Sequence, residues 1–161
     1  MNQPQELLAS RGYFLSRINP PSQIHTKVVG RDWPSLDQAI RKETLPGGVI
    51  FDELRKYAEF SEIEFIISIR SSLEYPDEDG IWHDDGSRLL AFSLSLTLDH
   101  EGVEGGRLEI RKRGSETSPS EVITTPPFGT MIVFSTGQSG FEHKINRVTS
   151  GERIIIAGWC T

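Results

Sequence analysis

The chain has 161 residues, about the usual size of one domain, and is long enough to bury a hydrophobic core. Its 17 lysines and arginines stand against 23 aspartates and glutamates, which gives a formal net charge of −6. Proteins that bind nucleic-acid backbones usually carry a basic surplus, so this balance argues against a nucleic-acid partner. The one short basic cluster, Arg111-Lys112-Arg113, is predicted to be the solvated end of a hairpin.

Cysteine usage and hydropathy restrict the protein class further. Cys160 is the single cysteine, which excludes an internal disulfide and a CxxC metal site. The first residues lack the basic and apolar regions of a secretory signal, and apolar runs such as 154–158 are too short to span a bilayer. We therefore expect a cytoplasmic protein with no membrane partner, and the sequence leaves its oligomeric state open.

The first third of the chain is predicted to be helical and irregular. A short helix is expected over 5–9, and Asn19-Pro20-Pro21 is expected to break the regular structure of the next residues. Ser35-x-x-Gln38 has the form of a capping box, which predicts a helix over 36–43. Apolar residues recur at three- and four-residue steps between Val49 and Phe60, which predicts a second and stronger helix.

From Ile63 onward the pattern changes to short strands separated by glycine- and proline-containing turns. Residues 89–98 alternate between apolar and hydroxyl side chains, so Ser93, Ser95 and Thr97 should share one face of a strand. That face suits either the interior of a barrel that holds a polar ligand or an ordinary solvent-exposed side. The other strands are expected at 65–69, 107–111, 121–124, 130–135, 143–148 and 153–159.

Many short strands preceded by helices predict a mainly β fold with flanking helices (α+β), either a sandwich or a jelly roll. We expect a single domain over 1–161. Within it, residues 1–62 should form a helical flank and residues 63–161 the β core. No internal repeat or low-complexity tract divides the sequence.

His83-x-Asp85 and the distant His143 supply two imidazoles and one carboxylate. In an extended segment residues i and i+2 point the same way, so His83 and Asp85 can face one ion while Asp84 points away. Such a set can hold ferrous iron on one face of an octahedron and leave positions open for ligands. The HxD spacing alone is common, and His143 taken alone is more consistent with an exposed histidine after a turn than with a metal ligand.

Arg153 opens an otherwise apolar strand ten residues after His143. A buried arginine needs a carboxylate partner, because an unpaired charge in the interior costs several kcal/mol. Either a protein side chain or a bound ligand must supply that carboxylate. The guanidinium fork suits this task, since it can hold a carboxylate through two parallel hydrogen bonds.

From about Ile63 to the C-terminus the chain resembles the Fe(II)- and 2-oxoglutarate-dependent dioxygenases, and within them the prolyl hydroxylase branch. The resemblance rests on an ordered set of motifs, none of which is specific alone. The set comprises His83-Asp84-Asp85, Glu104-Gly105-Gly106-Arg107-Leu108, Pro127-Phe128-Gly129-Thr130-Met131-Ile132-Val133-Phe134, His143-Lys144-Ile145-Asn146-Arg147-Val148-Thr149-Ser150-Gly151-Glu152-Arg153, and Trp159.

The resemblance implies a double-stranded β-helix in which His83, Asp85 and His143 bind iron and Arg153 binds the distal carboxylate of 2-oxoglutarate. It also implies that Thr97 assists the arginine, where the branch often has a tyrosine. The implied reaction is hydroxylation of an unactivated C–H bond with Fe(II), 2-oxoglutarate and O₂, releasing succinate and CO₂, with ascorbate as a candidate reductant. The expected substrate is a prolyl or other amino-acid side chain in a protein, or a small molecule.

The chain departs from the branch on the strand before HxD, where a tyrosine is common. Leu73 falls at about that place, and Arg70 or Tyr75 are candidates to compensate. The following acidic loop, residues 74–79, is hypothesised to flank the substrate entrance and favour basic or neutral segments, although a solvated loop is the simpler interpretation.

Two other functions stay open at this point. A cupin-type metal enzyme that does not use 2-oxoglutarate would not need Arg153. A non-catalytic jelly-roll interaction module should have lost at least one metal ligand, so the complete set counts against it. Leu108, Ile145 and Trp159 are expected either to wall the pocket or simply to pack in the core.

Overall fold

The computed structural model describes residues 3–117 and 119–161. Its helices are α1 Gln3–Arg11, α2 Ser22–Val29, α3 Trp33–Glu43 and α4 Val49–Leu54. Its strands are β1 Tyr13–Arg17, β2 Ile63–Ser71, β3 Leu90–Ser95, β4 Glu104–Gly105, β5 Leu108–Lys112, β6 Glu121–Ile123, β7 Thr130–Phe134, β8 Phe141–Ile145, β9 Val148–Ser150 and β10 Glu152–Cys160. Within the described ranges, no helix has the length and apolar character needed to cross a bilayer.

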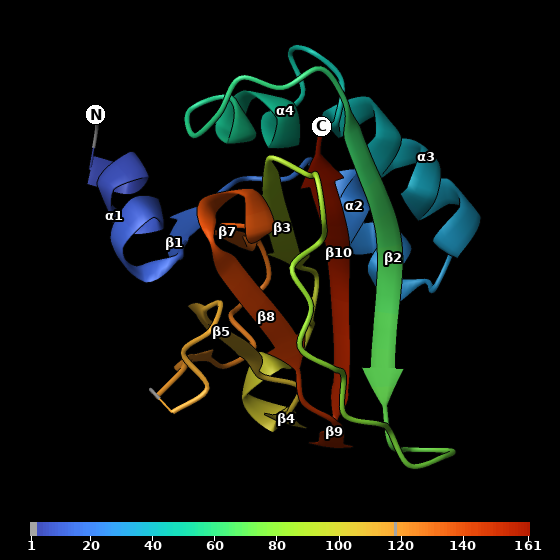
Figure 1. The fold of residues 1–161 in the computed structure, drawn as a ribbon. Helices are drawn as coiled ribbons and strands as arrows, with labels where there is room; N and C mark the ends of the chain where they lie inside the picture. The colour runs from blue at the N-terminus through green and yellow to red at the C-terminus, as the bar shows by residue number, and fades with distance from the viewer. Residues whose placement is uncertain (1–2, 118) are drawn as a thin grey trace.

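The strands form two main antiparallel sheets, as a jelly roll requires. The larger sheet has the order β1-β7-β3-β10-β2, the smaller one the order β6-β5-β8, and β4 pairs with β9. In Figure 1 helices α2 and α3 lie behind the larger sheet, while β8 crosses in front of it. This architecture confirms the predicted mainly β fold with flanking helices.

Strand β3 divides its side chains between two cores. Phe92 and Leu94 are fully buried against the helices in the larger hydrophobic cluster. Ser93 and Ser95 point to the opposite side, where the smaller sheet packs, and they are buried as well. The hydroxyl face of this strand therefore lies in the interior between the sheets, and the solvent-exposed alternative is wrong.

The N-terminal third contains more regular structure than the sequence predicts. Strand β1 was not expected, and it pairs with β7 through a register from Tyr13 opposite Phe134 to Arg17 opposite Thr130. Helix α2 was not expected either. It begins directly after Pro20-Pro21, because a proline at a helix start lacks only an N–H that has no helical partner there.

Two helix boundaries also differ from the prediction. Helix α3 begins at Trp33, because Asp32 is the N-cap and its carboxylate accepts a hydrogen bond from the Ser35 N–H at 3.2 Å. The expected start at the capping box of Ser35 is thus wrong. Helix α4 ends at Leu54 instead of Phe60, and the chain continues in turns, with the Tyr57 N–H bonded to the Leu54 carbonyl.

Candidate metal centre

His83 lies in the segment between β2 and β3, which runs antiparallel beside β8. The His83 N–H donates to the His143 carbonyl at 3.0 Å, and the His143 N–H donates to the His83 carbonyl at 2.9 Å. Residues that exchange both hydrogen bonds lie directly opposite each other, so their side chains leave the same face. The two imidazole centroids are accordingly 4.2 Å apart, although the residues are far apart in the sequence.

Asp85 completes the cluster. Its Oδ1 lies 3.4 Å from Nε2 of His83, and its Oδ2 lies 3.3 Å from Nε2 of His143. One ligand atom from each of the three residues lies within 4.8 Å of the others, so together they could hold a metal ion. Asp85 has a φ of 61°, a left-handed conformation that aspartate adopts more readily than most residues.

Asp84 points away from the cluster, as expected. Its Oδ1 accepts from the Gly86 N–H at 2.9 Å, and its Oδ2 pairs with Nη1 of Arg113 at 2.7 Å. Its backbone carbonyl accepts from the Gly137 N–H at 2.7 Å. Asp84 therefore fastens the HxD segment to its surroundings while Asp85 faces inward.

The electrostatic environment keeps Asp85 and His143 in the forms that bind metals. Burial lowers the pKa of His143 to about 4, so this imidazole is neutral at pH 7. Burial opposes ionisation of Asp85, but the histidines and the neighbouring Trp159 indole outweigh it and lower the pKa of this carboxyl group. The contact with Asp85 raises the pKa of His83. An ionised carboxylate and a neutral imidazole are the forms that coordinate metals.

The donor atoms fit a divalent metal. Asp85 Oδ2 and His143 Nδ1 are buried without a hydrogen-bond partner in the described part of the chain. A buried acceptor without a donor is costly, and a cation between the three residues would satisfy the Asp85 oxygen. Two cis ligands on an octahedral ion with bonds of about 2.1 Å lie roughly 3 Å apart, close to the separations seen here.

A cavity of about 120 Å³ is lined by the two histidines of the cluster, His83 and His143. Leu108, Ile145 and Trp159 all belong to its wall, as one of the two interpretations of these residues predicts. The wall also includes Arg153, which is 3 % exposed. Its full lining is His83, Phe92, Ser93, Leu108, Phe134, His143, Ile145, Arg153, Ile155, Ala157, Gly158 and Trp159.

Across the described residues, Arg153 is a buried cation without an acid in direct contact, and Asp77 acts on it only from a longer distance. Its Nε has no hydrogen-bond partner, and no acid among the described residues forms an ion pair with it. Burial, followed by repulsion from Arg70, lowers the pKa of Arg153 to about 10, so the side chain is still charged at pH 7. A carboxylate in contact with this arginine is therefore absent from the described residues, and a bound acid is a candidate to supply it.

The Gly105-Gly106 turn makes room for the arginine. Both residues have positive φ, 74° and 63°. A Cβ on Gly106 would lie 2.9 Å from Cδ of Arg153, and one on Gly105 would overlap the carbonyl oxygen of Arg147. The glycine pair of the motif is thus explained by close backbone and side-chain approach as well as by its conformation.

Thr97 lies beside Arg153 but not in the cavity wall. Its hydroxyl donates to the Ile154 carbonyl and accepts from the Ile154 N–H, both at 3.0 Å. Its expected role in binding the co-substrate stays a prediction. The hydrogen bonds instead show it holding strand β10 at the residue after Arg153.

The sequence did not single out Trp82, which holds the HxD segment from the outside. Its ring stacks under the guanidinium of Arg111 at 3.8 Å and lies 5.2 Å from Nζ of Lys144. Arg111 also pairs with Glu142 of β8 at 2.7 Å. Since Trp82 precedes His83, it faces the outside of the smaller sheet. The one signal in the sequence for this supporting role is that an aromatic residue directly precedes His83.

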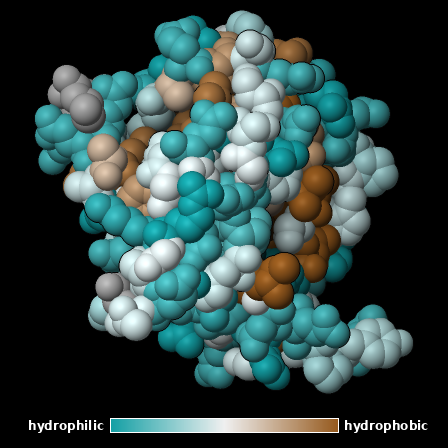
Figure 2. All heavy atoms as spheres, in the orientation of Figure 1, coloured by the Kyte–Doolittle hydropathy of each residue, from teal (hydrophilic) through white to brown (hydrophobic). Residues whose placement is uncertain are grey.

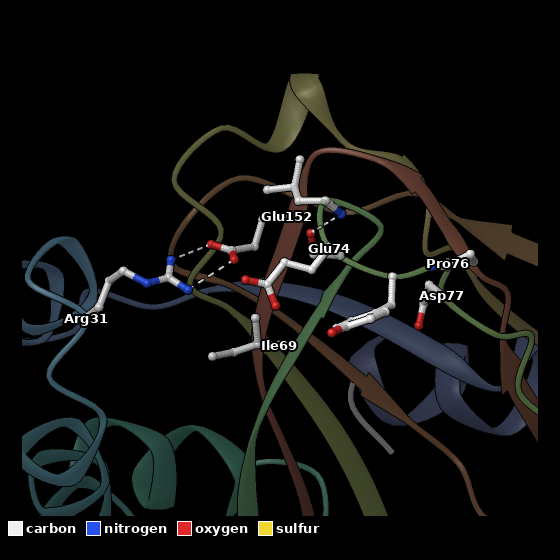
Figure 3. Close-up of a pocket in the computed structure, with 9 residues that line it drawn as sticks. Arg31, Ile69, Glu74, Pro76, Asp77 and Glu152 are labelled. Atoms are coloured by element: carbon white, nitrogen blue, oxygen red, sulfur yellow. Dashed lines mark hydrogen bonds and ion pairs between the residues drawn. The ribbon is translucent and has the colours of Figure 1, made fainter.

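A larger cavity, of about 520 Å³, has none of the three clustered residues in its lining. Figure 3 shows it between the ion pair of Arg31 with Glu152 and the loop that carries Glu74 and Asp77. It contains no cluster of metal ligands, and its arginine is already paired at 2.8 Å. We therefore place the chemistry in the smaller cavity.

The acidic loop is tied to the strand region beside the metal centre. Asp77 accepts from the Val148 N–H at 2.8 Å, and Asp79 accepts from the Arg147 N–H at 2.8 Å and pairs with its guanidinium at 3.0 Å. Two of the loop's carboxylates are therefore engaged within the protein. The hypothesis that the loop selects substrates by charge stays a prediction, and Glu74 and Glu78 are the acids on which it now depends.

Comparison with known proteins identifies the family. Residues 72–161, more than half of the chain, match the model of the 2OG-Fe(II) oxygenase superfamily. The chain belongs to this superfamily. It is a 2-oxoglutarate-dependent oxygenase, with Fe(II) and 2-oxoglutarate as its cofactors, and His83, Asp85 and His143 could bind the metal. No curated protein sequence matches the chain.

Solved structures share the fold over nearly the whole chain. A Pseudomonas putida prolyl-4-hydroxylase is 17% identical with a TM-score of 0.66, covering 98% of this chain and 92% of its own. A Trichoplax adhaerens prolyl hydroxylase, in complex with a hypoxia inducible factor peptide, is 13% identical with a TM-score of 0.60, covering 98% and 86%. Streptomyces hygroscopicus HygX, with nickel and 2-oxoglutarate bound, is 9% identical with a TM-score of 0.62, covering 99% and 86%.

These similarities confirm the double-stranded β-helix. They also extend over the N-terminal third, for which the sequence suggested no relative. At such low identity they show the fold alone.

Proposed function

We propose that the protein hydroxylates an unactivated C–H bond, with His83, Asp85 and His143 as the iron ligands and Arg153 as the anchor for the distal carboxylate of 2-oxoglutarate. The products would be the hydroxylated substrate, succinate and CO₂. The observation that carries the proposal is the buried, unpaired Arg153 in the wall of the same cavity as the two histidines. A cupin-type enzyme without 2-oxoglutarate would have no use for this charge.

The chain's own residues would bind, orient and shield the reactants. Bound Fe(II) with 2-oxoglutarate and O₂ supplies the oxidising chemistry. Arg153 would fix one end of the acid through two charge-assisted hydrogen bonds. Leu108, Ile145 and Trp159 would keep water away from the bound acid, since they supply apolar parts of the cavity wall.

The cavity size supports a substrate that reaches in from outside. Ligand pockets commonly measure roughly 300–1,000 Å³, so a cavity of about 120 Å³ holds little beyond one small acid. The side chain of His83 is 48% exposed, whereas that of His143 is 6% exposed, so the open side of the centre is at His83. We propose that the substrate presents one protruding group there.

The rim of this opening favours an apolar group. Ile66 of β2 is 53% exposed and lies opposite Ala157, a residue of the cavity wall. Ile81, two residues before His83, is 78% exposed. Hydrophobic side chains are visible on the surface over β2 in Figure 2. A prolyl or other amino-acid side chain of a protein fits this rim, and a small molecule is the alternative.

The cytoplasmic location, the single domain and ascorbate as reductant stay predictions.

The test is to mix anaerobic protein with Fe(II) and then with 2-oxoglutarate. We expect the weak visible charge-transfer band of a chelated 2-oxo acid, followed by succinate release when O₂ and a proline-containing peptide are added. Metal binding without any band at saturating 2-oxoglutarate would favour the cupin-type enzyme. No metal binding at all would favour the non-catalytic module.

A further inference from the structure

Arg70 and Arg153 are direct partners across the antiparallel strands β2 and β10. Side chains of such partners leave the same face with Cβ atoms about 4.5–5.5 Å apart, and like charges in this position repel. Arg153 faces the cavity, so Arg70 extends on that interior side as well. The repulsion is visible in the lowered pKa of Arg153, to which Arg70 contributes after burial.

Among the described residues, Asp77 is the one carboxylate that acts on both arginines, through an ion pair with Arg70 and only over a longer distance on Arg153. Nε of Arg70 lies 3.0 Å from Oδ2 of Asp77, and the side chains of these two residues are only 20% and 16% exposed. Arg70 Nη2 also donates a hydrogen bond to the Glu78 carbonyl. In the ranges 3–117 and 119–161 no further acid pairs with Arg70 or Arg153. Two cations and one anion leave a surplus positive charge in a largely buried place, where an uncompensated charge is costly.

We propose that Arg70 is a second binding residue for the distal carboxylate of 2-oxoglutarate, and that it links binding of this acid to the order of residues 72–79. The inference rests on the proposed role of Arg153. A guanidinium carries five N–H donors. In Arg70 the Nε and Nη2 groups contact the loop, which leaves the N–H groups of Nη1 for a ligand.

The link to the loop follows from these bonds. A carboxylate between the two arginines removes their repulsion and holds Arg70 in place. Arg70 in turn holds Asp77 and the Glu78 carbonyl. The loop depends on such tethers because its Leu73 and Tyr75 side chains are 76% and 77% exposed and contribute little packing. A second tether, Asp79 with Arg147, does not involve the cavity.

The binding test uses protein loaded with Ni(II), which does not turn over, and calorimetric titration with two acids. 2-Oxoglutarate has the distal carboxylate and 2-oxobutyrate lacks it. For Arg70→Gln we expect 2-oxoglutarate affinity to fall roughly tenfold or more, the size of one lost charge-assisted hydrogen bond, with 2-oxobutyrate affinity nearly unchanged. Arg147→Gln is the matched control, because it removes the other loop-tethering arginine, and it should leave both affinities unchanged.

Hydrogen exchange provides the second readout. 2-Oxoglutarate should slow exchange in residues 72–79 of the native protein and of Arg147→Gln, but not of Arg70→Gln. Thermal unfolding checks that each variant is folded. If Arg70→Gln does not fold, Arg70→Lys keeps the charge without the fork and should weaken 2-oxoglutarate binding selectively. Equal losses for both acids, or no loss, would overturn the inference. Failure of the native protein to bind 2-oxoglutarate would instead overturn the proposed function.

Discussion

The hydroxyl of Thr97 bonds to both backbone groups of Ile154, donating to its carbonyl and accepting from its N–H at 3.0 Å each. Thr97 is 1% exposed, and Ile154 directly follows Arg153. Strand β3 ends at Ser95, so the Thr97 side chain extends the hydrogen bonding between β3 and β10 beyond the end of the strand. It thereby fixes the backbone from which Arg153 enters the cavity.

Thr97→Val should therefore reduce both stability and 2-oxoglutarate affinity. Valine has nearly the same shape but leaves the Ile154 N–H unpaired, at a cost of about 1–3 kcal/mol, while the Ile154 carbonyl keeps its hydrogen bond from the Leu96 N–H at 2.9 Å. Thr97→Ser, which keeps the hydroxyl, should restore both properties. The measurements are thermal unfolding and calorimetric titration of the metal-loaded protein. Weaker binding of the acid at unchanged stability would show instead that the hydroxyl touches the ligand.

Gly106→Ala should weaken 2-oxoglutarate binding, because the added methyl group would displace the Arg153 side chain. Gly114→Ala is the matched control. Gly114 also has a positive φ, 80°, but nothing lies within 4 Å of the position of its Cβ. Both variants should lose about 1 kcal/mol of unfolding free energy from the strained backbone, and Gly106→Ala should lose more because its methyl group would also lie 2.8 Å from Cγ2 of Val148. If both bind the acid equally well, Gly106 does not position the arginine.

Asp85→Ala should abolish metal binding and succinate production, whereas Asp84→Ala should retain both. Asp85 faces both histidines, while Asp84 is engaged with Arg113 at the surface. Titration with Fe(II) under nitrogen and quantification of succinate measure the two effects. Equal losses in both variants would mean that the carboxylate ligand is wrongly assigned.

Trp82→Ala should lower metal affinity without removing a ligand. The ring stacks on Arg111 and supports the segment that carries His83, and such cation–π contacts contribute about 0.5–1 kcal/mol at partly exposed sites. Trp82→Phe keeps an aromatic ring, so its metal affinity should lie between those of the native protein and the alanine variant. Metal titration measures the change in metal affinity, and thermal unfolding of the metal-free protein measures any change in stability, so the two effects can be separated. A metal affinity independent of residue 82 would contradict this supporting role.

Glu53 should make the protein sensitive to acid. Burial raises the pKa of Glu53, but hydrogen bonds from Lys56 at 2.6 Å, Ser16 at 2.5 Å and Tyr57 at 2.8 Å outweigh it, so the net shift is downward from 4.5. A lowered folded-state pKa contributes stability that is present above the unfolded-state value and is lost as the pH falls through the folded-state value. Glu53→Gln should therefore be less stable than the native protein at pH 7, and the difference should shrink below pH 4.5. Denaturant unfolding of both proteins from pH 7 to below pH 4.5 measures this stability difference. A difference that does not change with pH would contradict the prediction.

The sequence predicted the β core well because local alternation determines which side chains face inward. Strands such as β5, β7 and β10 lie within about two residues of their expected bounds, and Arg153 faces inward as the alternation indicated. Strand β1 and helix α2 were missed. The first is a short edge strand whose partner, β7, lies more than a hundred residues away, and the second is hidden behind prolines.

Only the site residues that belong to sequence motifs could be predicted from the sequence. His83, Asp85 and His143 were found through their order and through family resemblance. The opposition of Arg70 and Arg153 depends on which strands pair and in which register. The clearance at Gly106 and the stacking of Trp82 depend on the tertiary contacts around them. No local pattern encodes these relationships.

The unequal exposure of the two histidines has a consequence for how a metal would leave. His143 is enclosed by Phe134, whose ring lies 4.7 Å away, whereas His83 borders solvent. An ion bound by the triad would exchange with chelators from one side only, and its release would begin at His83. A substrate seated over His83 would therefore also act as a kinetic barrier to metal loss.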